Sequence, residues 1–236
     1  MHKTSLNSIK GVFNDLTDLF YPRLCPGCEN VLRRNEKILC LNCMFNMPKT
    51  DHFEERENPL EKVFWGRLPL NWAAALYNFR KKGIVQNLVH NIKYRGQKEA
   101  AEFAGKQFAQ ELTNSELDKP GIIIPVPLHK RKLKQRGFNQ SYHFGLGISK
   151  ELQIPINDDI LVRKIHTGTQ TRKNRFERWK NVGHIFALQK SRLIENRHVL
   201  LIDDIVTSGA TIEASGLKIL EADGVSLSVG VIGQAT

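Results

Sequence analysis

Residues 199–211 read Val-Leu-Leu-Ile-Asp-Asp-Ile-Val-Thr-Ser-Gly-Ala-Thr, and this stretch decides the fold. Its first four residues, Val199–Ile202, form an apolar run bounded by charge, which is typical of a strand buried on both faces. A helical pattern follows over residues 211–222, and another apolar stretch follows over 225–232. A strand, a helix and a second strand in this order predict an α/β domain with a mostly parallel sheet flanked by helices.

The same alternation extends toward the N-terminus. Two further strands are expected over residues 71–77 and 122–126, because both stretches are short and apolar. Helical spacing of apolar residues predicts helices around residues 84–92, 99–112 and 139–152.

The turn Thr207-Ser208-Gly209-Ala210-Thr211 lies between the predicted strand and helix. Ligands of open α/β sheets bind at the carboxyl ends of the strands. Here the backbone N–H groups of a tight turn, three hydroxyl groups and a helix N-terminus would converge on one anion. Gly209 permits backbone conformations that a side chain would forbid. The turn is therefore predicted to bind a phosphate.

Asp203 and Asp204 precede this turn, and their negative charges would repel a phosphate. They are placed instead to accept hydrogen bonds from the vicinal hydroxyls of a sugar, so the whole stretch predicts a site for a ribose 5-phosphate group. The alternative is that the two acids cap the helix or chelate Mg²⁺ alone, which leaves the turn itself unexplained. No Walker A pattern occurs in the sequence, so a nucleoside-triphosphatase lacks its central motif.

The net charge of +11 is concentrated in one part of the chain. Between residues 121 and 182, thirteen Lys or Arg residues stand against four Asp or Glu residues. Such a local excess indicates a polyanionic partner, either nucleic acid or a phosphorylated substrate, and the alternative is a charge that only maintains solubility.

Two segments carry most of this charge. A basic loop is expected over residues 130–140, where Arg136-Gly137 suits the binding of a pyrophosphate, although a solvated basic turn explains it equally well. Residues 166–181, which include Gln170 and Arg178, are cationic and poorly periodic. They are expected to form a lid over an anionic substrate, with an ordinary surface loop as the alternative.

All four cysteines fall within nineteen residues, as Cys25-Pro-Gly-Cys28 and Cys40-Leu-Asn-Cys43. Two such C-x2-C turns can place four thiolates at the corners of a tetrahedron, which is the preferred geometry of zinc. Four sulfur ligands leave no open position, so the predicted zinc is structural. Disulfides are the weaker alternative in a reducing compartment.

The sequence therefore divides into a small N-terminal zinc-ribbon module within residues 1–50, which begins with an amphipathic helix, and an α/β domain over 63–236. Residues 48–62 are polar and are expected to form a linker. The N-terminal helix is expected to pack against its own protein, with a membrane surface as the alternative. No signal peptide and no membrane span is expected, so the chain is predicted to be cytoplasmic.

Residues 199–211 resemble the signature with which type I phosphoribosyltransferases bind phosphoribosyl pyrophosphate (PRPP): an apolar strand, two acids and a T-[ST]-G-x-T turn. Nearly the whole chain is similar to the ComF family of zinc-ribbon and phosphoribosyltransferase proteins. The matching stretches are the four cysteines, 92–96 (Ile-Lys-Tyr-Arg-Gly), 125–128 (Pro-Val-Pro-Leu), 136–140 (Arg-Gly-Phe-Asn-Gln), and Gln170, Arg178 and Asn181. With only four cysteines, the chain has room for one zinc ion rather than two.

This resemblance implies a type I phosphoribosyltransferase fold and a link to DNA uptake in natural transformation. It implies that pyrophosphate leaves C1′ of PRPP with the help of Mg²⁺ when a nitrogen nucleophile, whose identity is open, attacks. Asp203 and Asp204 would then hold the ribose and residues 207–211 the 5′-phosphate. Arg136, with Lys93 or Arg95, would bind the pyrophosphate, and Gln170 and Arg178 would belong to the lid.

A second hypothesis is a PRPP-responsive protein that binds single-stranded DNA without turnover and contacts other proteins of the DNA-uptake machinery. The charge and three tryptophans, Trp65, Trp72 and Trp179, permit this hypothesis, although each tryptophan also suits a core or an interface. A zinc-ribbon scaffold without a ligand site would leave the acid pair and the phosphate turn unexplained.

Overall fold

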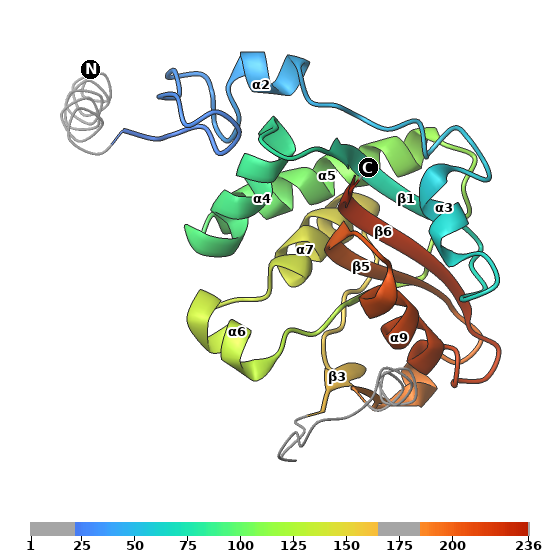
Figure 1. Ribbon diagram of the computed structural model, residues 1–236. Coiled ribbons are helices and arrows are strands. Elements are labelled where there is room, and N and C mark those ends of the chain that lie inside the picture. The colour runs from blue at the N-terminus through green and yellow to red at the C-terminus, as the bar shows by residue number, and fades with distance from the viewer. Residues whose placement is uncertain (1–21, 165–184, 236) are drawn as a thin grey trace, which may run out of the picture.

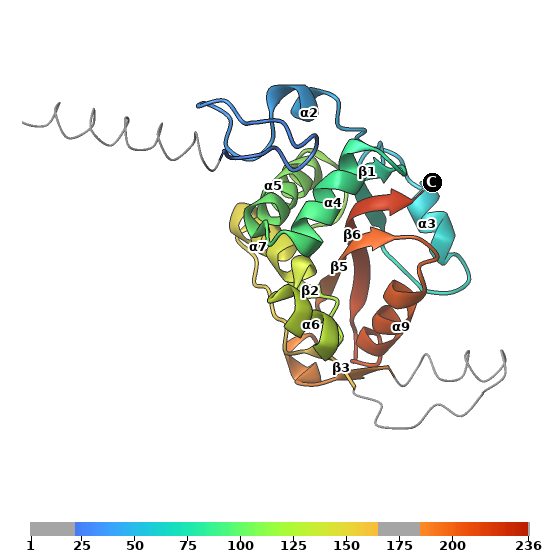
Figure 2. The ribbon, with the colours of Figure 1, turned by 60° about the vertical axis from the view of Figure 1, so that its left-hand side comes forward.

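A computed structural model describes residues 22–164 and 185–235 of the chain. Its centre is a four-stranded sheet in the order β1-β6-β5-β2, in which all three neighbouring pairs are parallel (Figures 1 and 2). The strands are β1 (Ala73–Phe79), β2 (Ile122–Pro125), β5 (His198–Val206) and β6 (Ser226–Ala235). The prediction of a parallel α/β sheet is confirmed.

Helices cover both faces of this sheet (Figures 1 and 2). One face carries α4 (Ile84–Tyr94), α5 (Lys98–Asn114) and α7 (Gln140–Leu152). The other carries α3 (Pro59–Phe64) and α9 (Ala210–Ile219), together with the antiparallel pair of β3 (Leu161–Arg163) and β4 (Phe186–Leu188). A short 3-10 turn over Ser191–Leu193 leads into β5.

The central strand β5 explains why the chain forms two hydrophobic layers. Leu200 and Ile202 point into the layer beneath α4, α5 and α7, whereas Val199 and Leu201 point into the layer beneath α3 and α9. All four side chains are 0% exposed, as the continuous apolar run predicts. This burial fixes the end of β5, and the residues that follow Ile202 are held in place by it.

The structure changes two expectations about secondary structure. The strand does not end at Ile202, because β5 continues through both aspartates to Val206. The basic loop is mostly a helix, α6 (Lys130–Arg136), which begins at His129 and ends at Gly137 in a left-handed conformation. None of the residues in α6 is buried. Because such a helix adds nothing to the apolar core, hydrophobic spacing could not reveal it.

Residues 48–62 are not a linker, which corrects that prediction. Lys49 pairs with Tyr77 of β1 in an antiparallel bridge, and the side-chain amide of Asn58, which is 2% exposed, donates to the Ala73 carbonyl at 2.9 Å. Asn58 also caps α3. The polar residues of this segment therefore satisfy backbone groups at the outer edge of β1 instead of facing only solvent.

The cysteine-bearing segment lies against α4 and α5, with the short helix α2 (Leu41–Phe45) on its outer side (Figure 2). Among residues 22–164 and 185–235, no helix combines the length and apolar character needed to cross a membrane. The predicted N-terminal helix and the predicted lid lie outside the described residues.

Candidate functional site

The acid pair lies at the carboxyl end of β5, between its neighbours β6 and β2. Asp204 is 6% exposed, and Asp203 is partly buried. Two adjacent carboxylates with so little solvent need positive charge or hydrogen-bond donors from other elements. The structure supplies both.

Asp204 is held by two side chains that come from separate helices. Lys93 Nζ, in the last turn of α4, lies 2.8 Å from Asp204 Oδ1. Gln140 Nε2, at the first position of α7, donates to Asp204 Oδ2 at 2.6 Å. Gln140 is itself 2% exposed, so this amide is fixed by its surroundings. Together these contacts use both carboxylate oxygens of Asp204.

Asp203 has hydrogen bonds but no direct ion pair among the described residues. The Ser141 hydroxyl donates to Asp203 Oδ1 at 2.9 Å, and the backbone N–H of Asp204 donates to the same oxygen at 2.8 Å. Burial, and next the neighbouring charge of Asp204, raise the pKa of Asp203 to about 7, against an opposing contribution from Lys93. Asp203 therefore exchanges its proton near neutral pH.

The turn after β5 is open to solvent at its hydroxyl-bearing residues. Thr207, Ser208 and Thr211 are exposed, whereas Gly209 is buried with φ +75°. A side chain at Gly209 would place its Cβ 2.8 Å from both Val63 and Phe64 of α3. Gly209 is also the N-cap of α9 and receives no side-chain cap there. The acids lie in β5, so the alternative that they cap α9 is excluded.

Arg67 fixes the orientation of one peptide in this turn. Its Nη1 donates to the Ser208 carbonyl at 3.1 Å, and its guanidinium also pairs with Glu213 in the first turn of α9. In a trans peptide the carbonyl and the following N–H point in opposite directions. Since the Ser208 carbonyl faces Arg67, the Gly209 N–H points away from Arg67.

The predicted pyrophosphate-binding cations are not all brought to the acid pair. Lys93 lies there, in contact with Asp204. Arg136 stacks on Tyr94, with Cζ 5.4 Å from the ring centroid, and its Nε is buried without an acceptor among the described residues. Arg95 instead pairs with Glu29 of the cysteine-bearing segment at 3.1 Å. Gln170 and Arg178 lie outside the described residues.

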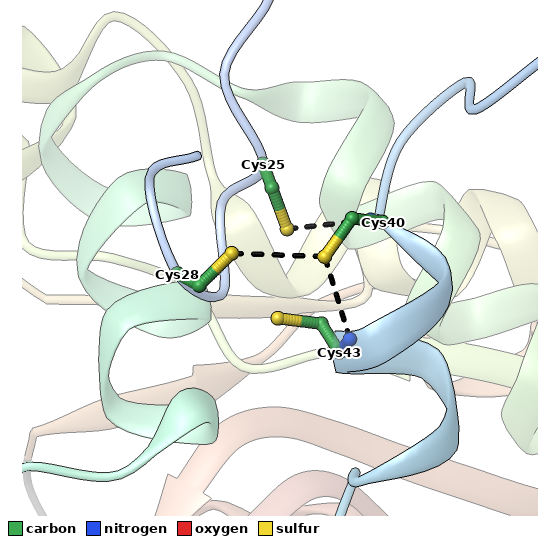
Figure 3. A group of neighbouring side chains, drawn as sticks. All are labelled: Cys25, Cys28, Cys40 and Cys43. Carbon is green, nitrogen blue, oxygen red and sulfur yellow. Dashed lines mark hydrogen bonds between the residues drawn. The ribbon is translucent and has the colours of Figure 1, made fainter. Parts of the chain in front are cut away.

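The four cysteines are brought together as free thiols (Figure 3). Their sulfur atoms all lie within 4.8 Å of one another, and the Cys28 and Cys40 sulfurs are 3.6 Å apart. A tetrahedral zinc–thiolate site with bonds of about 2.3 Å has sulfur–sulfur distances of about 3.8 Å. Backbone N–H groups of Cys40 and Cys43 point at the sulfurs of Cys25 and Cys40. The donor set and its spacing therefore fit a structural zinc ion.

Sequence reasoning missed several residues of this site. Gln140 and Ser141 contact the acids directly, and Asn139 orients them by capping α7 through the Ser141 N–H and by donating to the Val126 carbonyl at 3.1 Å. The sequence contains an indication of their role. Residues 139–141 are all polar, and they begin a helix that follows a strand of the same sheet. Arg163 of β3 was also missed: burial lowers its pKa, and the charge of Asp203 opposes that shift.

The comparisons with known proteins agree with this geometry. Residues 139–232 match the family model described as phosphoribosyl transferase domain. The chain is 26% identical over 193 residues to the DNA utilization protein YhgH of Escherichia coli (strain K12), with 80% of each chain covered. It is 23% identical over 200 residues to the competence protein ComFC of Bacillus subtilis, covering 84% of this chain and 78% of that protein.

The chain therefore resembles competence and DNA utilization proteins over most of its length, and it contains a phosphoribosyl transferase domain. The matched domain begins at Asn139, so it includes the polar start of α7, the acid pair and the turn over 207–211. The protein has a type I phosphoribosyltransferase fold preceded by a four-cysteine cluster. Among solved structures, it is similar to the glutamine PRPP amidotransferase of B. subtilis, with 19% identity and a TM-score of 0.43 over 57% of this chain and 26% of that chain.

Proposed function

We propose that this protein is a member of the ComF family and that it binds PRPP at the carboxyl end of β5. Asp203 and Asp204 accept hydrogen bonds from the ribose hydroxyls, and the turn over residues 207–211 binds the 5′-phosphate. The observation that carries the proposal is a buried acid pair, fixed by Lys93 and Gln140, directly before an exposed turn rich in hydroxyl groups.

The chemistry of the two halves supports one ligand rather than two. Carboxylates are strong acceptors for sugar hydroxyls, and Asp203 Oδ2 has no hydrogen bond within the described residues. The turn offers neutral donors and the uncapped N-terminus of α9, which favour an anion. A ribose that carries a phosphate on its 5′-carbon matches this change from acceptors to donors.

As an enzyme, the protein transfers the phosphoribosyl group to a nitrogen nucleophile. The C1′–O bond to pyrophosphate breaks, the C1′–N bond forms, and the acceptor nitrogen loses a proton. Mg²⁺, if it binds together with PRPP, would supply positive charge that helps pyrophosphate to leave. The protein's residues contribute positioning: the acids orient the ribose and the turn fixes the phosphate. Lys93, beside Asp204, supplies positive charge at the same end of β5.

A structural zinc ion in the cysteine cluster completes the proposal. The four sulfurs supply all four ligands of a closed tetrahedral site. Free thiols at such short distances also suit a reducing cytoplasm, where they stay available to the metal.

Binding of PRPP can be tested by isothermal titration calorimetry in the presence of Mg²⁺. The double variant Asp203→Asn/Asp204→Asn should lose binding but keep its fold. The chain offers a matched control, because Asp158-Asp159 is a second, exposed aspartate pair before β3. Asp158→Asn/Asp159→Asn should bind PRPP like the unchanged protein. Equal binding by both double variants would overturn the assignment of the ribose site. Pyrophosphate release that requires an added acceptor would establish transfer.

Single-stranded DNA is the second candidate ligand, and one observation favours it. Lys130, Arg131, Lys132 and Lys134 are exposed on α6, and the exposed ring of Tyr94 lies beside this helix under Arg136. Cations that follow a backbone and an aromatic ring that stacks on a base are the usual elements of such a surface. The names of the relatives, competence protein and DNA utilization protein, support a role in DNA uptake with other proteins of that machinery.

The DNA hypothesis predicts a strong dependence of affinity on salt. For single strands, log K falls with log salt by about 0.7 per phosphate contact, so replacing the four exposed cations of α6 by Ser should reduce the slope by up to about 3. Fluorescence anisotropy of a labelled oligothymidine at several salt concentrations measures this slope. An unchanged slope would remove α6 from the DNA-binding surface.

A further inference from the structure

The helix α4 contacts both the cysteine cluster and the acid pair. Ile84, Asn87, Asn91 and Arg95 recur at steps of three and four residues, so they share one face of this helix and its end. All four contact the segment that contains Cys25 and Cys28, as the distances below show. Lys93 lies two residues from Asn91, on another side of the helix, and contacts Asp204.

Two asparagines attach α4 to the backbone between the first two cysteines. Asn91 Nδ2 donates to the Pro26 carbonyl at 2.9 Å, and Asn87 Nδ2 donates to the Gly27 carbonyl at 3.0 Å. Asn91 is 1% exposed, and its Oδ1 is buried without a hydrogen-bond partner among the described residues. Burying an amide whose oxygen has no hydrogen-bond partner destabilises the folded state. The hydrogen bond to the Pro26 carbonyl is the contact that compensates for this and explains why Asn91 is an asparagine.

The same turn is packed against α4 without spare room. A Cβ at Gly27 would lie 2.8 Å from Ile84 Cγ2 and 2.9 Å from the Cys43 sulfur. Gly27 is therefore confined between the start of α4 and the cysteine cluster. At the other end of α4, Arg95 pairs with Glu29, which directly follows Cys28. The cysteine segment thus contacts α4 from its first residue to its C-cap.

We propose that the metal-loaded cysteine cluster is a positioning element for the ligand site, and that Asn91 is the residue that transmits its geometry through α4 to Lys93 and Asp204. The proposal rests on the function proposed above, because it takes the acid pair as the ribose site. It assigns the N-terminal module a role in the site in addition to its own folding.

The physical basis is the rigidity of a short helix that is held at several points. Residues Asn91 and Lys93 are two positions apart, so a shift of α4 at the cysteine turn moves the Lys93 backbone by a similar amount. The side chains of Lys93 and Asp204 are 20% and 8% exposed. Breaking a buried ion pair leaves a charge that water reaches poorly, and misplacement by about 1 Å can weaken a site by up to about a hundredfold.

The test combines two perturbations, removal of the metal and Asn91→Ala, and measures the affinity for PRPP after each one and after both. Calorimetry would compare the zinc-loaded protein and the same protein treated with a chelator selective for transition metals, with Mg²⁺ present throughout. Chelation should weaken PRPP binding by about ten- to a hundredfold. Asn91→Ala should cause a similar loss while zinc is still bound, and chelation should then add little. Additive effects would show that the two act independently and would overturn the proposal.

Two further variants separate the hydrogen bond from packing. Asn91→Asp has the same shape but presents acceptors to the Pro26 carbonyl, so it should weaken PRPP binding as Asn91→Ala does. Asn114→Ala changes an exposed asparagine at the last position of α5 and should leave both PRPP affinity and its response to chelation unchanged. If Asn91→Asp binds PRPP normally, Asn91 has no positioning role.

A direct measurement on the acid pair distinguishes positioning from general loss of structure. Asp203 is faced by Asp204 of β5, Lys93 of α4, Arg163 of β3 and the hydroxyl of Ser141 of α7. The charge of Lys93 lowers the pKa of Asp203, so displacing it should raise the pH at which the Asp203 carboxyl titrates. NMR of that carboxyl carbon should show the same upward shift for chelation, Asn91→Ala and Lys93→Met.

This titration needs no ligand, so it separates the two proposals. If the zinc-loaded protein binds no PRPP but chelation still shifts the titration of Asp203, the proposed function fails and the coupling through α4 stands. If PRPP binds and neither chelation nor Asn91→Ala shifts the titration or the affinity, the coupling fails and the ligand assignment stands.

Discussion

Replacing Asp203 by Asn should make the protein more stable at alkaline pH, although it removes a residue of the proposed ligand site. The hydrogen bonds at Asp203 Oδ1 come from the Ser141 hydroxyl and the Asp204 N–H, and both donors can bond to an amide oxygen. The substitution therefore removes a partly buried negative charge beside Asp204 but keeps the acceptor.

The magnitude follows from the pKa of Asp203. Burial, and next the charge of Asp204, raise this pKa from 3.8 to about 7. At about 1.4 kcal/mol for each pKa unit, ionising Asp203 costs the folded state up to about 4 kcal/mol above pH 7. The cost is absent below about pH 4, grows between about pH 4 and 7, and is constant above, because only the folded state retains the proton in that window.

The assay is chemical denaturation of the unchanged protein and Asp203→Asn between pH 4 and 8. Asp203→Asn should gain about 1 to 4 kcal/mol at pH 8 and almost nothing near pH 4. Thermal unfolding should show the same trend, with about 2 to 4 °C for each kcal/mol in a domain of this size.

The exposed Asp158 provides the control, because Asp158→Asn should change stability little at any pH. A variant Asp203→Asn that is no more stable at pH 8, or whose gain is independent of pH, would refute the reasoning. Either result would mean that Asp203 is ionised at little cost in the folded protein.

Two other changes test the neighbouring elements. Cys40→Ser should abolish stoichiometric zinc binding, measured by atomic absorption. It should also lower the unfolding temperature, because zinc binding supplies folding energy to the cysteine module. Full stability without metal would contradict the zinc site. Gly209→Ala should weaken PRPP binding at least about tenfold and destabilise the fold by about 1 to 3 kcal/mol. The reason is that φ of Gly209 is +75° and that the new Cβ would contact Val63 and Phe64. Unchanged PRPP affinity in calorimetry would show that the turn tolerates a side chain.

The sequence predicted those parts of the fold that depend on local pattern. Val199–Ile202 is apolar at every position, and only a strand covered on both faces buries such a run. The acids and the turn after it were predicted as a ligand site for the same reason, since parallel sheets present ligands at the carboxyl ends of their strands. The clustering of the four cysteines was predicted just as directly, because the spacing of the two C-x2-C turns limits how the sulfur atoms can be arranged.

The contacts that the sequence did not predict join distant segments of the chain. Lys93 and Asp204 are 111 positions apart, and Gln140 and Asp204 are 64 apart. Nothing in the spacing of a helix indicates which polar residue at its end will face another strand. Composition was misleading for residues 48–62, because polar side chains such as Asn58 were assigned to solvent but are used to satisfy the backbone of β1.

The two buried carboxyl groups differ in how the protein compensates their charge, and this difference affects ligand binding. Asp204 pairs directly with Lys93, whereas Asp203 has no ion pair among the described residues and its pKa is raised to about 7. A protonated Asp203 offers fewer lone pairs to the hydroxyl groups of a sugar, so we expect PRPP to bind the ionised form more tightly. The affinity for PRPP should then rise as the pH increases through 7, and over the same range the ionisation of Asp203 lowers the stability of the folded protein. The charged form of Asp203 that the proposed ligand is expected to need is thus the form that destabilises the fold, and the charge of Lys93, which lowers the pKa of Asp203, reduces this cost.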